Sequence, residues 1–197
     1  MIDIPKNNET LSEKTLADRV FASHKEFLKL APQYDRKVWD PRVAVKEHRG
    51  SCMAELLFVA SGLIAEGEIS EDDIKVGFSK NHGTSQVVDL IGTTGKLYAH
   101  SFMLLSAGNG VILEADFRAN RADEAPRIQR LLPDELESDK LYISALSNAI
   151  KHYAEIDNQT GPTVNELVDL YLNYSDKGNS ASVRNADSEA VRFDQDF

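Results

Sequence analysis

Cysteine is nearly absent from this 197-residue chain, in which Cys52 carries the only thiol. A single cysteine excludes an intramolecular disulfide and a cysteine-rich zinc site. The five histidines are scattered, and no two of them show the HxxxH or HExxH spacing of a metal site. The sequence therefore predicts no bound metal and no cofactor.

Long apolar runs and an excess of basic residues are also lacking. No segment approaches transmembrane length, and residues 1–6 contain no apolar region of a secretory signal. The formal net charge is -10 and the pI is near 5.0, which argues against nucleic acid or an anionic membrane as the main partner. We expect a protein partner or substrate and a cytoplasmic location in the producing cell. Delivery into a target cell by a specialised secretion system is the alternative, because such export leaves no signal of this kind.

The chain is long enough for one domain, and its 42% hydrophobic residues can build a core. Residues 1–13 are polar and predict a flexible N-terminus. Residues 14–174 carry the periodic patterns and predict one α+β domain. Residues 175–197 are rich in Asn, Ser, Asp and Gly and predict a disordered C-terminal tail.

Helical spacing of apolar residues predicts a helix over residues 11–30, with His24 on its surface. Residues 33–48 read as irregular, with Trp39 as a packing anchor. Towards the C-terminus, residues 133–156 look mostly helical, and a strand at residues 141–144 is the alternative. A capping box that begins at Thr163 predicts the start of a last helix.

The β signal is strongest in the middle of the chain. Residues 74–78 and 86–91 predict short strands. Residues 97–106 and 111–117 are rich in β-branched, aromatic and aliphatic residues, and Ala-Gly-Asn-Gly lies between them, which is typical of a hairpin turn. The charged residues 118–130 predict a loop.

The chain is organised around the segment at residues 49–64, which is an apolar helix preceded by Gly-Ser-Cys. Ser51 can cap the helix, so that Cys52 occupies about its first position. The partial positive charge of a helix N-terminus favours a thiolate over a thiol there. The alternative is that Cys52 is simply a small core residue. Glu55, one turn further on, is expected to be solvated or structural.

The predicted hairpin adds two groups to this thiol. His100 and Asp116 lie on its two arms, and their numbers are symmetric about Gly108. A turn centred near Gly108 places them opposite each other, give or take one residue of register, with Cβ atoms roughly 4.5–5.5 Å apart. At that distance a carboxylate can accept the imidazole N–H and fix its tautomer. Burial of a histidine without a catalytic role is the competing interpretation.

This order of Cys, His and Asp resembles the papain-like and transglutaminase-like superfamily of cysteine enzymes, and especially its compact bacterial effector and toxin members. The matching stretches, at residues 50–53, 99–102 and 114–116, fall within about a third of the chain. The resemblance implies a papain-like or transglutaminase-like α+β fold, in which a central helix carries the cysteine and packs on an antiparallel sheet with flanking helices. It also implies a catalytic triad of Cys52, His100 and Asp116.

Three function classes follow from these residues. The first is acyl transfer at a glutamine side chain, most simply deamidation, with transglutamination as its variant. The second is peptide-bond cleavage by the same triad, as in a cysteine protease, and the third is a non-catalytic binding module on the same fold. One departure from papain-type enzymes is that residues 44–50 contain no glutamine to serve as an oxyanion donor. Asn81, His82 and Gln86 are candidate replacements.

Overall fold

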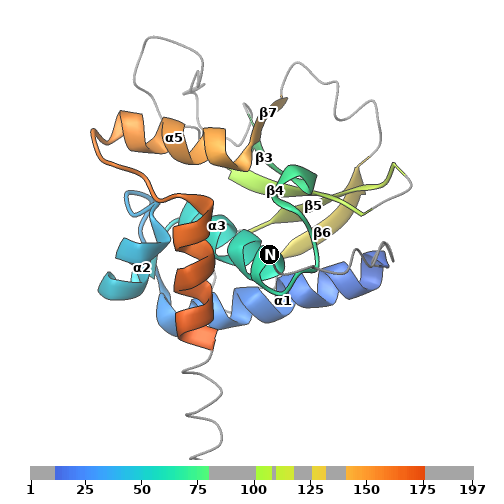
Figure 1. Cartoon of the computed structure of the whole chain (residues 1–197), viewed down its shortest axis with the longest axis horizontal. Coiled ribbons are helices and arrows are strands. Elements are labelled where there is room, and N and C mark those ends of the chain that lie inside the picture. The colour runs from blue at the N-terminus through green and yellow to red at the C-terminus, as the bar shows by residue number, and fades with distance from the viewer. Residues whose placement is uncertain (1–11, 80–100, 108–109, 118–125, 132–140, 176–197) are drawn as a thin grey trace, which may run out of the picture.

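The structure is a computed structural model that describes residues 12–79, 101–107, 110–117, 126–131 and 141–175. It is a mixed α+β arrangement of an antiparallel sheet with flanking helices (Figure 1). The helices are α1 (Glu13–Leu30), α2 (Pro41–Glu47), α3 (Cys52–Ala65), a 3₁₀ turn η1 (Glu71–Asp73), α5 (Leu146–Ile156) and a last helix at residues 164–175.

Five strands form the main sheet in the order β6-β5-β4-β3-β7, and every neighbouring pair is antiparallel. They are β3 (Ile74–Ser79), β4 (Ser101–Ser106), β5 (Ile112–Asp116), β6 (Arg127–Leu131) and β7 (Leu141–Ala145). Two further strands, β1 (Gln33–Tyr34) and β2 (Arg49–Gly50), pair in parallel with each other and form a separate short ladder. The sheet thus ends in β6 on one side and β7 on the other.

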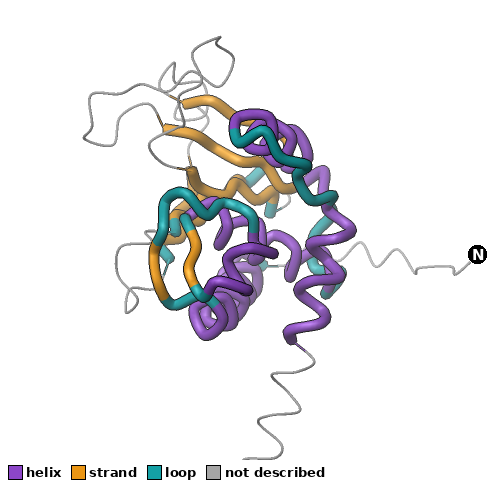
Figure 2. Tube along the Cα trace, turned by 90° about the vertical axis from the view of Figure 1, so that its left-hand side faces the viewer, coloured by secondary structure: helices purple, strands orange, loops and turns teal. Residues whose placement is uncertain are grey.

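The main core lies between α3 and one face of the sheet. Alternate residues of the strands point to that face, so that Met103 and Leu105 of β4 pack with Leu113 and Ala115 of β5. Residues of α1, α3 and α5 complete the same cluster. Figure 2 shows the helices gathered to one side of the sheet. The opposite face carries a smaller apolar cluster that includes Phe102 and Leu104 of β4.

Helix α3 is the centre of the molecule because nearly all of its surface is covered. Every residue from Met53 to Leu63 is buried. The helix at residues 164–175 closes one side of it: the ring of Tyr171 lies 5.3 Å from that of Phe58. Gly62 allows this approach, since a Cβ there would lie 2.6 Å from the Tyr171 ring. The apolar run of α3 is long because neighbouring elements of the fold cover the helix on several sides.

Several predicted elements are confirmed. The first helix begins at Glu13 with Ser12 as its cap, and β3 occupies the predicted strand at residues 74–78. At the last helix the Glu166 N–H donates to Thr163 Oγ1, and the Glu166 carboxylate accepts from the Thr163 N–H at 2.7 Å. These two reciprocal bonds are the predicted capping box.

Trp39 is a packing anchor, as predicted. It is buried, its ring lies 5.5 Å from that of Tyr153, and its indole N–H donates to Asp157. The hydrogen bond joins the N-terminal third of the chain to the end of α5. It therefore fixes the connecting segment before α3 against the C-terminal part of the fold.

Three local predictions were wrong or incomplete. The predicted loop at residues 118–130 contains the start of β6, which pairs with β5. Its charged residues are tolerated because β6 lies at the edge of the described sheet, where Arg127 and Arg130 are exposed. The irregular segment at residues 33–48 contains α2, which Asp40 caps and Pro41 begins. Of the two alternatives for residues 141–144, the structure has the strand, β7, paired with β3.

Candidate active site

The start of α3 is held in place by the residues just before it. Gly50 lies so close to neighbouring side chains that a Cβ would be 2.9 Å from the Phe27 ring and 3.0 Å from the Ala44 methyl group. The Ser51 N–H donates to the Val38 carbonyl at 2.8 Å. The Ser51 hydroxyl accepts from the Ala54 N–H at 3.4 Å and so caps the helix, as predicted. These contacts make Cys52 the first residue of α3.

The Cys52 thiol is half-buried and meets the sheet at the first residue of β4. Its Sγ lies 3.4 Å from the Ser101 hydroxyl, which is itself 1% exposed. A thiol at this place feels the partial positive charge of the helix N-terminus, which favours the thiolate. The structure therefore brings the only thiol of the chain to the residue that directly follows His100 in the sequence.

Strand register places Asp116 at the same end of the sheet as Ser101. Paired residues of β4 and β5, such as Met103 and Ala115, have numbers that sum to 218. The hairpin is thus centred on position 109, one residue beyond the predicted Gly108, and this register puts Asp116 opposite Phe102. Asp116 ends β5 and is 3% exposed. His100 lies outside the described residues, so its pairing with Asp116 stays a prediction.

A second group of titratable residues was missed by the sequence reasoning. His24 of α1 is buried, not on the helix surface as predicted, and its Nδ1 is hydrogen-bonded to the Glu55 carboxylate. The spacing contained a signal for this, because His24 follows Val20 by four residues and precedes Phe27 by three. These positions form one stripe along a helix, and the stripe faces α3. Glu55 was expected to be either solvated or structural, and the structure shows that it is buried and has a structural role.

Burial dominates the electrostatics of Glu55, which is 2% exposed. It raises the pKa of this carboxyl above its usual range. The hydrogen bond and charge of His24 oppose the rise in pKa, and the charge of Asp116 adds to it. The His24 ring also lies 6.2 Å from that of Phe117, the residue after Asp116. The end of β5 thus lies close to the His24–Glu55 pair.

Tyr34 is a further side chain near the thiol. It pairs with Gly50 in the β1–β2 ladder, two residues before Cys52, and its side chain is 45% exposed. Partial burial raises the pKa of Tyr34 to about 12, and a negative charge on Cys52 adds to the rise. The phenol is therefore protonated at neutral pH and can donate a hydrogen bond. The predicted donors Asn81, His82 and Gln86 lie outside the described residues.

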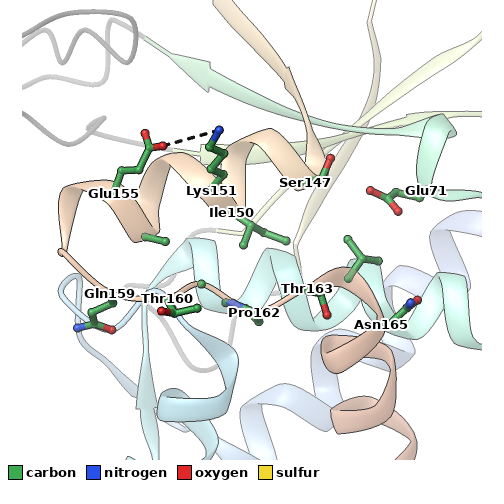
Figure 3. A pocket seen from close by; sticks show the side chains of 13 residues that line it. Glu71, Ser147, Ile150, Lys151, Glu155, Gln159, Thr160, Pro162, Thr163 and Asn165 are labelled. Carbon is green, nitrogen blue, oxygen red and sulfur yellow. Dashed lines mark ion pairs between the residues drawn. The ribbon is translucent and has the colours of Figure 1, made fainter.

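A cavity of about 580 Å³ lies elsewhere in the molecule, between α5 and the segment leading into the last helix (Figure 3). Ile150 and Val164 contribute apolar surface, and Lys151 and Glu155, 3.9 Å apart, lie on its α5 side. Cys52 and Ser101 do not line this cavity. The cavity therefore gives no information about the chemistry of the Cys52 thiol.

Among the described residues, no three His, Cys, Asp or Glu side chains are grouped so that they could hold a metal ion. None of the helices in the described ranges is long and apolar enough to cross a membrane. No protein-family model matches the chain, and no curated protein and no solved structure gives a significant match. The site must therefore be interpreted from its own residues.

Proposed function

We propose that this chain is a thiol-dependent acyl-transfer enzyme with Cys52 as its nucleophile and a protein amide as its substrate. The observation that carries the proposal is the position of the thiol at the start of α3, 3.4 Å from the hydroxyl of Ser101 at the start of β4. This is where a papain-like or transglutaminase-like enzyme needs its cysteine: on a central helix that packs against an antiparallel sheet. The papain-like or transglutaminase-like fold of this chain is part of the same proposal.

The proposed chemistry proceeds through a thioester. His100 takes the proton of Cys52, and the thiolate attacks the carbonyl carbon of a glutamine side chain. Asp116 orients the imidazole, which returns the proton to the leaving ammonia. Water, deprotonated by the same imidazole, then attacks the thioester, releases the thiol and leaves glutamate on the substrate. The reaction consumes one water and releases one ammonia.

The negative oxygen that forms in both steps needs hydrogen-bond donors. Backbone N–H groups at the start of a helix are suited to this, and the protonated phenol of Tyr34 is a side-chain candidate. Tyr34 is half-exposed on the short ladder that leads into α3, so it can meet a substrate that approaches the thiol. It would fill the role of the glutamine that residues 44–50 lack.

Deamidation is favoured over peptide cleavage because ammonia is a small leaving group that requires no extended peptide cleft. An amine in place of water would give transglutamination from the same thioester. The net charge of -10 suits a substrate protein with a basic surface. A cysteine protease and a non-catalytic binding module remain as outcomes that the experiments distinguish.

Iodoacetamide labelling as a function of pH tests the nucleophile without knowledge of the substrate. Because the chain has one cysteine, the mass of the whole protein reports Cys52 alone. We expect the labelling rate to titrate below the ordinary thiol pKa of about 8.5. His100→Ala should raise the apparent pKa, whereas the matched control His48→Asn should leave it unchanged. Labelling only after denaturation would reject the proposal.

Mass spectrometry of candidate partner proteins tests the reaction. Incubation with the wild type should convert specific glutamines to glutamate, which adds about one mass unit, and Cys52→Ala should abolish the change. Cys52-dependent backbone cleavage without this conversion would assign the protein to the proteases. If Cys52→Ala and the wild type bind a partner equally well and neither modifies it, the binding module is correct.

A further inference from the structure

A buried hydroxyl on β4 lies against the proposed nucleophile. Ser101 is the first residue of this strand and is 1% exposed. Side chains alternate along a strand, so Ser101 points to the same face as Met103 and Leu105, which belong to the main core. The hydroxyl is therefore a polar group on the core side of the sheet, where it needs a hydrogen-bond partner.

The Cys52 sulfur supplies this partner. Among the described residues it is the one hydrogen-bond partner of the Ser101 hydroxyl, with a distance of 3.4 Å between Sγ and Oγ. A hydroxyl carries a single donor hydrogen, and a buried donor that is left without an acceptor is costly. If the thiol donated to the hydroxyl instead, the Ser101 hydrogen would lack an acceptor. The hydrogen of Ser101 is therefore directed at the sulfur.

The strength of this hydrogen bond depends on the charge of the sulfur. Hydrogen bonds to an ionised acceptor are roughly twice as strong as those between neutral groups. A donor that binds the thiolate more strongly than the thiol shifts the protonation equilibrium towards the thiolate. This contribution adds to that of the helix N-terminus, because Cys52 is also the first residue of α3.

We propose that Ser101 is a catalytic hydrogen-bond donor: its hydroxyl donates to the Cys52 sulfur and stabilises the thiolate. The role in catalysis rests on the proposed function, but the acidity of the thiol is measurable without any substrate. In the proposed reaction the sulfur is negatively charged twice, as the attacking thiolate and again when it leaves the thioester carbon with the electron pair of the C–S bond. A donor on β4 stabilises the sulfur in both states.

Ionisable side chains also lie on the elements around the start of α3. They are His24 of α1, Asp40 of α2, Glu55 of α3 itself, Asp116 of β5, Tyr34 of β1 and Arg49 of β2. Ser101 is uncharged, so its replacement by another uncharged residue leaves all of these groups in place. A change of the thiol pKa in such a variant therefore reports the hydrogen bond rather than the charges of the neighbours.

The test is the pH dependence of iodoacetamide labelling in two matched pairs of proteins. The first pair is the wild type and Ser101→Ala. Loss of the hydroxyl should raise the apparent pKa of Cys52 by about one unit, which slows labelling about 10-fold at a pH below both pKa values. The second pair is Ser101→Thr and Ser101→Val, which have nearly the same shape and differ in a hydroxyl against a methyl group. Ser101→Thr should titrate close to the wild type, and Ser101→Val should titrate like Ser101→Ala.

Ser61→Ala is the matched control on α3. Ser61 is also 1% exposed, and its hydroxyl donates to the Leu57 carbonyl. It lies roughly 13.5 Å further along the helix than Cys52. Ser61→Ala thus removes a buried hydroxyl without touching the thiol, and its labelling pKa should equal that of the wild type.

The labelling pKa decides the proposal. An unchanged or lowered pKa in Ser101→Ala overturns it, and so do equal pKa values in Ser101→Thr and Ser101→Val. A lower limiting rate at high pH without a shift of the midpoint also overturns it, because that result gives Ser101 a role only in access to the thiol. An ordinary thiol pKa in the wild type is a different result: it rejects the proposed function, whereas a further rise in Ser101→Ala would still establish the hydrogen bond.

Discussion

The two ends of α3 bury polar groups to very different extents. At the C-terminal end, Gly67 adopts a left-handed φ of 69°. The N–H groups of Gly67 and Glu68 donate to the Ile64 and Leu63 carbonyls, both at 3.0 Å. Glu66 accepts from the Tyr171 hydroxyl at 2.7 Å. These bonds satisfy the last carbonyls and side chains of a helix, which is what a stable helix end requires.

The N-terminal end contains more than a cap. Ser51 satisfies the helix start, but the same turn also buries Glu55 with His24, and the half-buried thiol of Cys52 lies beside it. Buried ionisable groups are costly and add nothing that the helix needs. Local departures from the most stable choice concentrate at functional sites. The comparison therefore supports the proposed site at the start of α3 and ordinary packing at its end.

The largest effect is expected from overfilling the C-terminal end. Gly62→Leu forces a side chain into space where even a Cβ would lie 2.6 Å from the Tyr171 ring. The free energy of unfolding should fall by about 3 kcal/mol in urea denaturation. Gly67→Ala, which meets no atom within 4 Å but requires a positive φ, should cost about 1 kcal/mol. The labelling pKa of native Cys52 should stay unchanged in both, and a shift would remove the contrast between the ends.

An intermediate effect is expected from removing one polar contact at each end. Ser51→Ala deletes the cap of α3 and should lower the free energy of unfolding by about 1 kcal/mol. Tyr171→Phe deletes the hydrogen bond to Glu66 and should cost a similar amount, about 1 kcal/mol. Only Ser51→Ala should also change the rate at which Cys52 is labelled. Equal labelling rates in the two variants would contradict a special role for the N-terminal end.

The smallest effect is a pH dependence of stability. Burial raises the pKa of Glu55 in the folded protein above its ordinary value of 4.5, so the folded state binds more protons than the unfolded state between these two values. Stability from this group must therefore fall as the pH rises from 4.5 through the raised pKa. Thermal midpoints of Glu55→Gln should fall less than those of the wild type over this range. A wild type that gains stability relative to Glu55→Gln would show that His24 outweighs burial.

Much of the fold could be predicted because it depends on local patterns. The cap at Ser51, the apolar run of α3 and the capping box at Thr163 are written in adjacent residues and were confirmed. Strand β6 could not be predicted, because the charged residues of this segment suggest a loop. It is a strand because it pairs with β5, and that pairing cannot be seen in the local sequence. The helical pattern after residue 133 likewise obscured β7, which exists because β3 pairs with it.

The candidate site was predictable only in part. The position of Cys52 follows from local sequence, but its contact with Ser101 depends on how α3 packs against β4. The partnership of His24 and Glu55 joins residues 31 apart in the chain. Nothing in the sequence pairs them, although the spacing of His24 from Val20 and Phe27 could have predicted that the histidine is buried. Tyr34 was missed for the same reason, since its place near the thiol depends on a ladder of two residues.

The bond between Trp39 and Asp157 has a consequence for synthesis on the ribosome. Its partners are 118 residues apart, and the bond between Tyr171 and Glu66 spans 105. Contacts of such sequence separation form late and slow the folding of a chain. The apolar helix that carries Cys52 is made first, and Tyr171, which covers it, is made 105 residues after Glu66. Prematurely ended chains therefore expose this helix, which makes them prone to aggregate and natural clients of chaperones.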